Sequence, residues 1–132
     1  VMGGIFGEGI DLVGERLVGA IIVGVGLPQI CLERNLIRSY FDAQEISGFE
    51  YAYTFPGMNR VLQAAGRVIR TDEDRGMVML VDERFGQGRY RRIFPPFWYP
   101  VHQARTPEQI EASLGMFWSG VSETRYEPVY ED

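Results

Sequence analysis

At residues 63–70 the chain reads Gln-Ala-Ala-Gly-Arg-Val-Ile-Arg, with polar and apolar residues at helical spacing. On a helix, one stripe holds an amide, a glycine and two guanidinium groups: Gln63, Gly66, Arg67 and Arg70. The opposite side is apolar: Val61, Leu62, Ala65, Val68 and Ile69. We predict a helix that buries one face in a domain. Its outer face suits an anion, because arginine stays charged and offers a planar fork of donors to phosphate oxygens.

The glycine inside this predicted helix needs a physical reason. A glycine in a helix interior costs about 1 kcal/mol relative to alanine. We therefore expect another group to approach closely at Gly66. For the two arginines alone, a solvated basic face on an ordinary core helix stays open as an alternative reading.

Four segments together resemble one family. The pattern Gln-x-x-Gly-Arg-x-x-Arg at 63–70 resembles motif VI of superfamily-2 helicases, and Gly-Glu-Gly-Ile-Asp at 7–11 resembles motif V of their DinG/XPD branch. Residues 23–28 resemble the strand and proline that follow motif V in that branch, and residues 81–85 resemble the Asp-x-Arg-Phe that follows motif VI. The matches cover roughly the first hundred residues in family order, so the resemblance is specific.

The resemblance implies an α/β fold: a partial RecA-like, P-loop NTPase-type, three-layer fold with a short, mainly parallel sheet, truncated at the N-terminus. It implies the C-terminal part of an ATP-dependent DNA helicase, whose ATP site is shared with a first RecA-like domain. Arg70 would be the arginine finger, Arg67 would contact phosphate and Gln63 would orient water or the arginines. The residues implied in nucleotide binding and coupling are Gly7, Glu8, Gly9, Asp11 and Gly66.

The chain lacks other parts of such a site. It contains neither Gly-x-x-x-x-Gly-Lys-Ser/Thr nor Asp-Glu-x-His. ATP and Mg²⁺ would therefore be bound mainly by the first domain, and we expect this chain alone to be inactive. The single cysteine, Cys31, and the single histidine, His102, cannot form a structural zinc site, so we expect no metal here. The resemblance allows an iron–sulfur cluster elsewhere in a longer protein.

A basic and aromatic segment follows the last motif: Arg84, Arg89, Tyr90, Arg91 and Arg92, then Phe97, Trp98 and Tyr99 among prolines. Arginines interleaved with aromatics can hold a nucleic-acid backbone, so Arg84, Arg89, Arg91 and Arg92 are candidate contacts for single-stranded DNA. The alternative, which we favour, is a proline-aromatic segment that packs on the domain while its arginines remain solvated.

Composition limits the possible partners. The chain has 132 residues, 45% of them hydrophobic, which is typical of a globular core. Its net charge of −5 excludes a basic surface overall, so any DNA contact must be local. No apolar run has transmembrane length and no signal-peptide pattern is present, so we expect no membrane contact and a cytoplasmic location. A non-catalytic nucleic-acid-binding or interaction module of α/β fold remains the alternative function.

The pattern along the chain predicts alternating strands and helices. We expect a central strand at 18–25 covered on both faces, a helix with a broad apolar face at 29–44, and a strand at 77–82. We divide the chain into a partial helicase domain at 1–100, an amphipathic helix packing on it at 101–121, and a flexible acidic tail at 122–132. An open edge on the truncated sheet favours a homo-oligomer.

Overall fold

The computed structural model describes residues 17–68 and 74–120. The chain divides between Ile93 and Phe94 into two compact units, which are described separately below. The domain limits predicted after residues 100 and 121, and the homo-oligomer, stay predictions. Among the described residues, no helix combines the length and the apolar character needed to cross a membrane.

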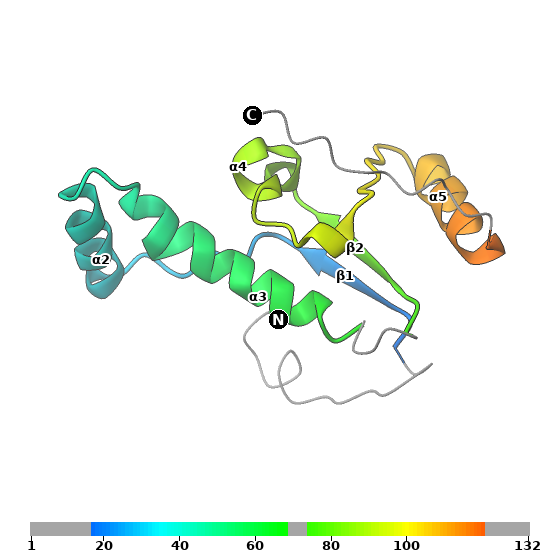
Figure 1. The fold of residues 1–132 in the computed structure, drawn as a ribbon, viewed down its shortest axis with the longest axis horizontal. Coiled ribbons are helices and arrows are strands. Elements are labelled where there is room, and N and C mark those ends of the chain that lie inside the picture. The colour runs from blue at the N-terminus through cyan, green and yellow to red at the C-terminus, as the bar shows by residue number, and fades with distance from the viewer. Residues whose placement is uncertain (1–16, 69–73, 121–132) are drawn as a thin grey trace. The chain divides into compact units, whose positions relative to one another are not determined.

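The first unit is built on a two-stranded parallel sheet (Figure 1). Strand β1 (Gly19–Val23) pairs with β2 (Met77–Val81), and Gly19 lies opposite Met77 in the register. Parallel neighbours need a long crossover connection, and helices fill it here. The predicted α/β class with a short parallel sheet is confirmed.

The burial of β1 differs from the prediction. Ile22 is only 4% exposed, whereas its neighbours Ile21 and Val23 are 65% and 70% exposed. Successive side chains on a strand point to opposite faces, so only one face of β1 is covered. The prediction of a strand covered on both faces is wrong for the described structure. An apolar run indicates that a strand can be buried, but it does not show whether other segments pack on both of its faces.

Three helical segments form the crossover: α2 (Leu32–Asp42), the π-helix η2 (Glu50–Thr54) and α3 (Phe55–Ala65), which continues directly from η2. The predicted helix at 29–44 is thus present but shorter. Its apolar side chains Leu32, Leu36 and Tyr40 are exposed, and no residue of α2 is buried. Instead α2 is attached to η2 by polar groups and by one stacked ring pair, Phe41 on Tyr51.

The core of this unit lies along α3, which contacts β1 (Figure 1). Met58 and Val61 of α3 are fully buried, as is Val25 just after β1. Pro56 stands in the first turn of α3, where a missing N–H costs little. The apolar spacing read from the sequence therefore places this helix correctly against the sheet.

Two short helices follow β2: η3 (Glu83–Gly86) and α4 (Gly88–Arg91). Each buries one aromatic ring, Phe85 in η3 and Tyr90 in α4. These buried rings fix the basic segment after β2 to the first unit.

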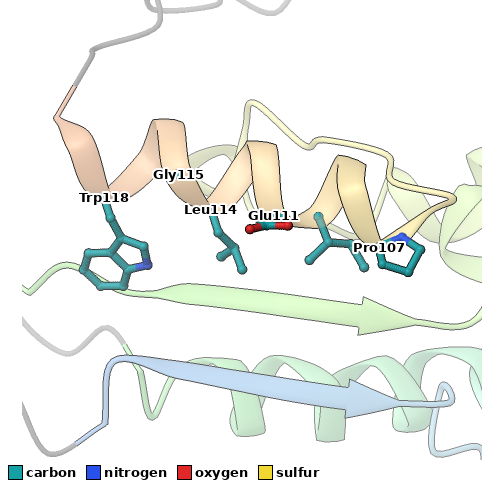
Figure 2. Close-up of a pocket in the computed structure, with 6 residues that line it drawn as sticks. Pro107, Glu111, Leu114, Gly115 and Trp118 are labelled. Carbon is teal, nitrogen blue, oxygen red and sulfur yellow. The ribbon is translucent and has the colours of Figure 1, made fainter.

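The second unit contains the short 3₁₀-helix η4 (Pro96–Trp98) and α5 (Pro107–Ser119), which is the only α-helix described within the predicted range 101–121 and is shorter than that range. The Thr106 hydroxyl caps α5 by accepting from the Gln109 N–H, and Gly120 ends it with a positive φ of 74°. Apolar side chains on one side of α5, including Leu114 and Trp118, line an open pocket of about 440 Å³ (Figure 2). The packing predicted for this helix stays a prediction.

Candidate functional site

The helix that carries the residues predicted to bind phosphate ends earlier than predicted. Helix α3 stops at Ala65, and Gly66 is its C-cap. The N–H groups of Arg67 and Val68 donate to the carbonyls three residues back, at 3.4 and 3.0 Å. The prediction of a regular helix through Arg67 is therefore wrong. Glycine favours this result, because it propagates a helix poorly and lets the last turn tighten.

The division into an outer and an inner side is nevertheless confirmed for the described residues. Gln63 and Gly66 are exposed and Arg67 is half-buried, while Ala65 and Val68 are buried. Arg70 and Ile69 lie outside the described residues, as do the motif V residues Gly7, Glu8, Gly9 and Asp11. The structure therefore brings together Gln63, Gly66 and Arg67 at one end of α3.

Gly66 lies against the preceding turn of its own helix. A Cβ added there would lie 3.2 Å from the carbonyl oxygen of Leu62, in the preceding turn of the same helix. Within the described residues, no atom of another segment lies within 4 Å of such a Cβ, and the expected close approach of another group to Gly66 stays a prediction. The Leu62 carbonyl also accepts from the Gly66 N–H at 2.8 Å in the ordinary helical pattern, so this contact does not by itself require glycine.

The other end of α3 is held by the loop after β1. A Cβ on Gly57 would lie only 3.0 Å from the Val25 carbonyl oxygen and 2.9 Å from Cδ2 of Leu27. Arg60 Nη1, one turn further along, donates to the Gly26 carbonyl at 3.3 Å. Gly26 itself has a positive φ of 66°, which favours glycine. This loop therefore sets the position of α3 and of the polar residues at its far end.

The strand end after β2 holds an internal ion pair. Arg84 donates through Nε and Nη2 to the two carboxylate oxygens of Asp82, at 2.8 and 2.7 Å. These hydrogen bonds lower the pKa of Asp82 and raise that of Arg84. The Asp82 carboxylate also accepts from the Arg84 backbone N–H and caps η3. The guanidinium group of Arg84, a predicted DNA contact, is therefore already hydrogen-bonded to the carboxylate of Asp82.

The other three predicted DNA contacts have different surroundings. Arg92 forms an ion pair with Glu50, and the guanidinium of Arg89 lies over the rings of Phe49 and Tyr90. Arg91 is half-buried on α4. Sequence spacing missed Glu50 and Phe49 as neighbours of this segment, because about forty residues separate them from it and no local pattern signals the contact.

Within the described residues, no group of three or more His, Cys, Asp or Glu side chains could hold a metal ion. Several donor groups lie at α3 and α4: the Gln63 amide and the guanidinium groups of Arg67, Arg89 and Arg92, the last of which is paired with the Glu50 carboxylate. Such groups bind anions, and phosphate in particular.

Comparison with known proteins adds a family. A family model described as "Helicase C-terminal domain" matches residues 1–101. A "Probable ATP-dependent helicase" of Methanocaldococcus jannaschii is 35% identical over 100 residues, covering 67% of this chain and 15% of that protein. The "ATP-dependent DNA helicase DinG" of Photobacterium profundum is 31% identical over 100 residues, covering 71% and 14%.

A third relative is the "General transcription and DNA repair factor IIH helicase subunit XPD" of Schizosaccharomyces pombe. It is 27% identical over 92 residues, covering 67% of this chain and 12% of that protein. The chain thus spans 12–15% of the length of these three relatives.

Proposed function

This chain belongs to the helicase C-terminal domain family, and from that premise we propose that it is part of the second motor domain of an ATP-dependent DNA helicase. The relatives named DinG and XPD confirm the resemblance inferred from the motifs. The observation that carries the proposal is the match over residues 1–101, which contains all four motif-like segments in order. Its partners would be a first RecA-like domain and single-stranded DNA.

In this proposal, the exposed end of α3 faces the phosphates of ATP held mainly by the first domain. The donor set fits a polyphosphate: an exposed amide on Gln63 and a half-exposed guanidinium on Arg67 lie beside a glycine that adds no side chain. The buried side of α3, with Met58 and Val61, supports this end rigidly against β1. A preorganised donor costs little reorganisation when charge develops.

The two arginines, Arg67 and Arg70, would have different roles. Arg67 would position the phosphates through its planar fork, and Arg70 would neutralise charge in the transition state as the arginine finger. The bound nucleotide supplies the phosphoryl group that is transferred to water. Loss of the terminal phosphate would remove contacts to both guanidinium groups and favour separation of the two domains. Glu8, Gly9 and Asp11 would couple that separation to movement on DNA.

The test is the ATPase rate of the longer protein that carries this segment, with and without single-stranded DNA. We expect Arg70→Ala to lower DNA-stimulated kcat by about 10³-fold or more while nucleotide binding is largely retained. Arg67→Ala should lower both nucleotide affinity and kcat. The matched control is Arg38→Ala, which removes an arginine paired with Asp42 on the surface of α2.

Two results would overturn the proposal. DNA-stimulated hydrolysis that is unchanged in both Arg67→Ala and Arg70→Ala would remove the motif VI role. The absence of any hydrolysis by the wild-type longer protein would instead favour a non-catalytic module that retains the fold.

A further inference from the structure

A second polar site lies in the first unit, away from the end of α3. A pocket of about 440 Å³ opens between the start of η2 and α4. Its lining residues are Ser47, Phe49, Glu50, Arg89 and Arg92. Two guanidinium groups, one hydroxyl and one carboxylate thus border a single pocket. Their formal charges sum to a positive value, in a chain whose net charge is −5.

The two arginines of this pocket are held in different ways. Arg92 is paired with the carboxylate of Glu50, although its side chain stays 59% exposed. The Arg89 guanidinium carbon lies 5.6 Å from the Phe49 ring centre and 5.4 Å from that of Tyr90. Among the described residues, Arg89 has aromatic rings but no carboxylate as a partner. Rings restrain the guanidinium plane without occupying its N–H donors in the way a carboxylate does.

Arg89 and Arg84 therefore differ in whether their N–H donors are available to an incoming anion. The donors of Arg84 are matched by both oxygens of Asp82, so an incoming anion would have to displace an internal carboxylate. Arg89 is exposed and already oriented, with Arg92 and the Ser47 hydroxyl lining the same pocket. Donors from three side chains that line one pocket suit the tetrahedral oxygens of phosphate.

We propose that this pocket binds a phosphate group of a nucleic-acid backbone, through Arg89 with Arg92 and Ser47. The Arg89 guanidinium lies over the Phe49 ring, and the centres of the Phe49 and Tyr53 rings are 5.2 Å apart. The Phe49 ring therefore has no open face on which a base could stack. Contacts of this kind position a strand without reading its sequence. The choice of nucleic acid as the source of the phosphate rests on the proposed function.

The test measures binding of a fluorescent single-stranded DNA homopolymer to the 132-residue chain by anisotropy, without ATP, over a range of salt concentrations. Each phosphate contact on a single strand contributes about 0.7 to the slope of log affinity against log salt. We expect Arg89→Gln to weaken binding about threefold to tenfold at low salt and to reduce the slope by about 0.7. Arg38→Gln is the matched control, because it removes the same charge from a side chain that is 52% exposed.

A second variant should act in the opposite direction. Glu50→Gln removes the carboxylate that competes for Arg92, so binding should strengthen and the slope should steepen by up to about 0.7. Far-UV circular dichroism and thermal unfolding check that both variants remain folded. Opposite effects of Arg89→Gln and Glu50→Gln, with no effect of Arg38→Gln, would support a phosphate site at this pocket, because a general change in net charge would affect the two Arg→Gln variants alike.

Three outcomes would overturn the proposal: no DNA binding by the wild-type chain at low salt, equal effects of Arg89→Gln and Arg38→Gln, or weaker binding by folded Glu50→Gln. Millimolar inorganic phosphate distinguishes the source of the ligand. If phosphate perturbs the Arg89 side-chain NMR signals and the oligonucleotide does not, the pocket takes free phosphate and the nucleic-acid assignment is wrong. Because the assay contains no ATP and leaves Arg67 and Arg70 intact, its result is independent of the ATPase test.

Discussion

Substitution of Gly57 by alanine should destabilise the first unit, although alanine is the better helix former. The added Cβ would lie 3.0 Å from the Val25 carbonyl oxygen and 3.3 Å from the Leu27 Cα, and both are backbone atoms of the loop after β1. Ordinary contacts begin near 3.4 Å, so α3 and this loop would have to separate by a few tenths of an ångström. The Cδ2 of Leu27, at 2.9 Å, can rotate away at lower cost.

The magnitude follows from two opposing terms. Overpacking of a core contact costs about 1–3 kcal/mol, and the helical preference of alanine returns at most about 1 kcal/mol. We expect a net loss of about 1–2 kcal/mol in the free energy of unfolding, seen as a lower midpoint in urea denaturation followed by circular dichroism. If the proposed function holds, ATPase activity of the longer protein should fall as well, because the displaced helix carries Gln63 and leads into the turn with Arg67.

The matched control is Gly88→Ala, at the first residue of α4 in the same unit. A Cβ there meets nothing within 4 Å, so the substitution should stabilise by about 0.4–1 kcal/mol through the unfolded chain. If Gly57→Ala raised the urea midpoint as Gly88→Ala does, the close seating of α3 on the loop would be refuted.

Two further predictions concern buried or paired polar groups. Asp82→Asn should cost about 1–2 kcal/mol at pH 7 by weakening the fork with Arg84. Because Arg84 lowers the pKa of Asp82 in the folded state, the contribution of this carboxylate is complete above the pKa of the unfolded carboxyl and is lost as the pH falls through the lowered value. The difference between wild type and Asp82→Asn in urea midpoint should therefore shrink on acidification, and a difference that grows would contradict the assignment. Thr54→Val should stabilise by about 1 kcal/mol in thermal unfolding, because the Thr54 hydroxyl is fully buried with no hydrogen-bond partner among the described residues; a lower melting temperature would show that the hydroxyl is bonded.

The sequence predicted those parts of the fold that depend on local periodicity. The apolar spacing at residues 61–68 predicted Val61, Ala65 and Val68 on the buried side, and they are buried, whereas Leu62 of the same set is only half-buried. Pro56 in the first turn of this helix and Pro107 at the start of α5 are local signals of the same kind, because proline is tolerated where an N–H has no helical partner. The end of α3 was missed, since helical spacing alone cannot distinguish a continuing helix from a tight last turn at Gly66.

The features that the sequence did not predict depend on contacts between segments that are distant along the chain. Arg92 and Glu50 are 42 residues apart, and nothing in either local sequence indicates that they pair. Nothing in the local sequence indicates the contact of Arg89 with Phe49 either. This contact orients the guanidinium group of an arginine that the sequence alone would leave fully solvated. The exposed face of β1 has a related cause, because burial of Ile21 or Val23 depends on which layers pack against the strand and not on the strand itself.

The geometry of α3 explains how one helix can be both structural and functional. Its first turn is fixed, since Gly57 touches the loop after β1 and Met58 is fully buried. Its last turn is open on one side, where Gln63 and Gly66 are exposed. Because Arg60 of α3 donates to the Gly26 carbonyl, a shift of the loop at Gly26 would also displace α3 and the turn at Gly66 and Arg67 that follows it. Under the proposed function, the loop after β1 would therefore set the position of the phosphate-facing end of α3 without contacting the phosphate itself.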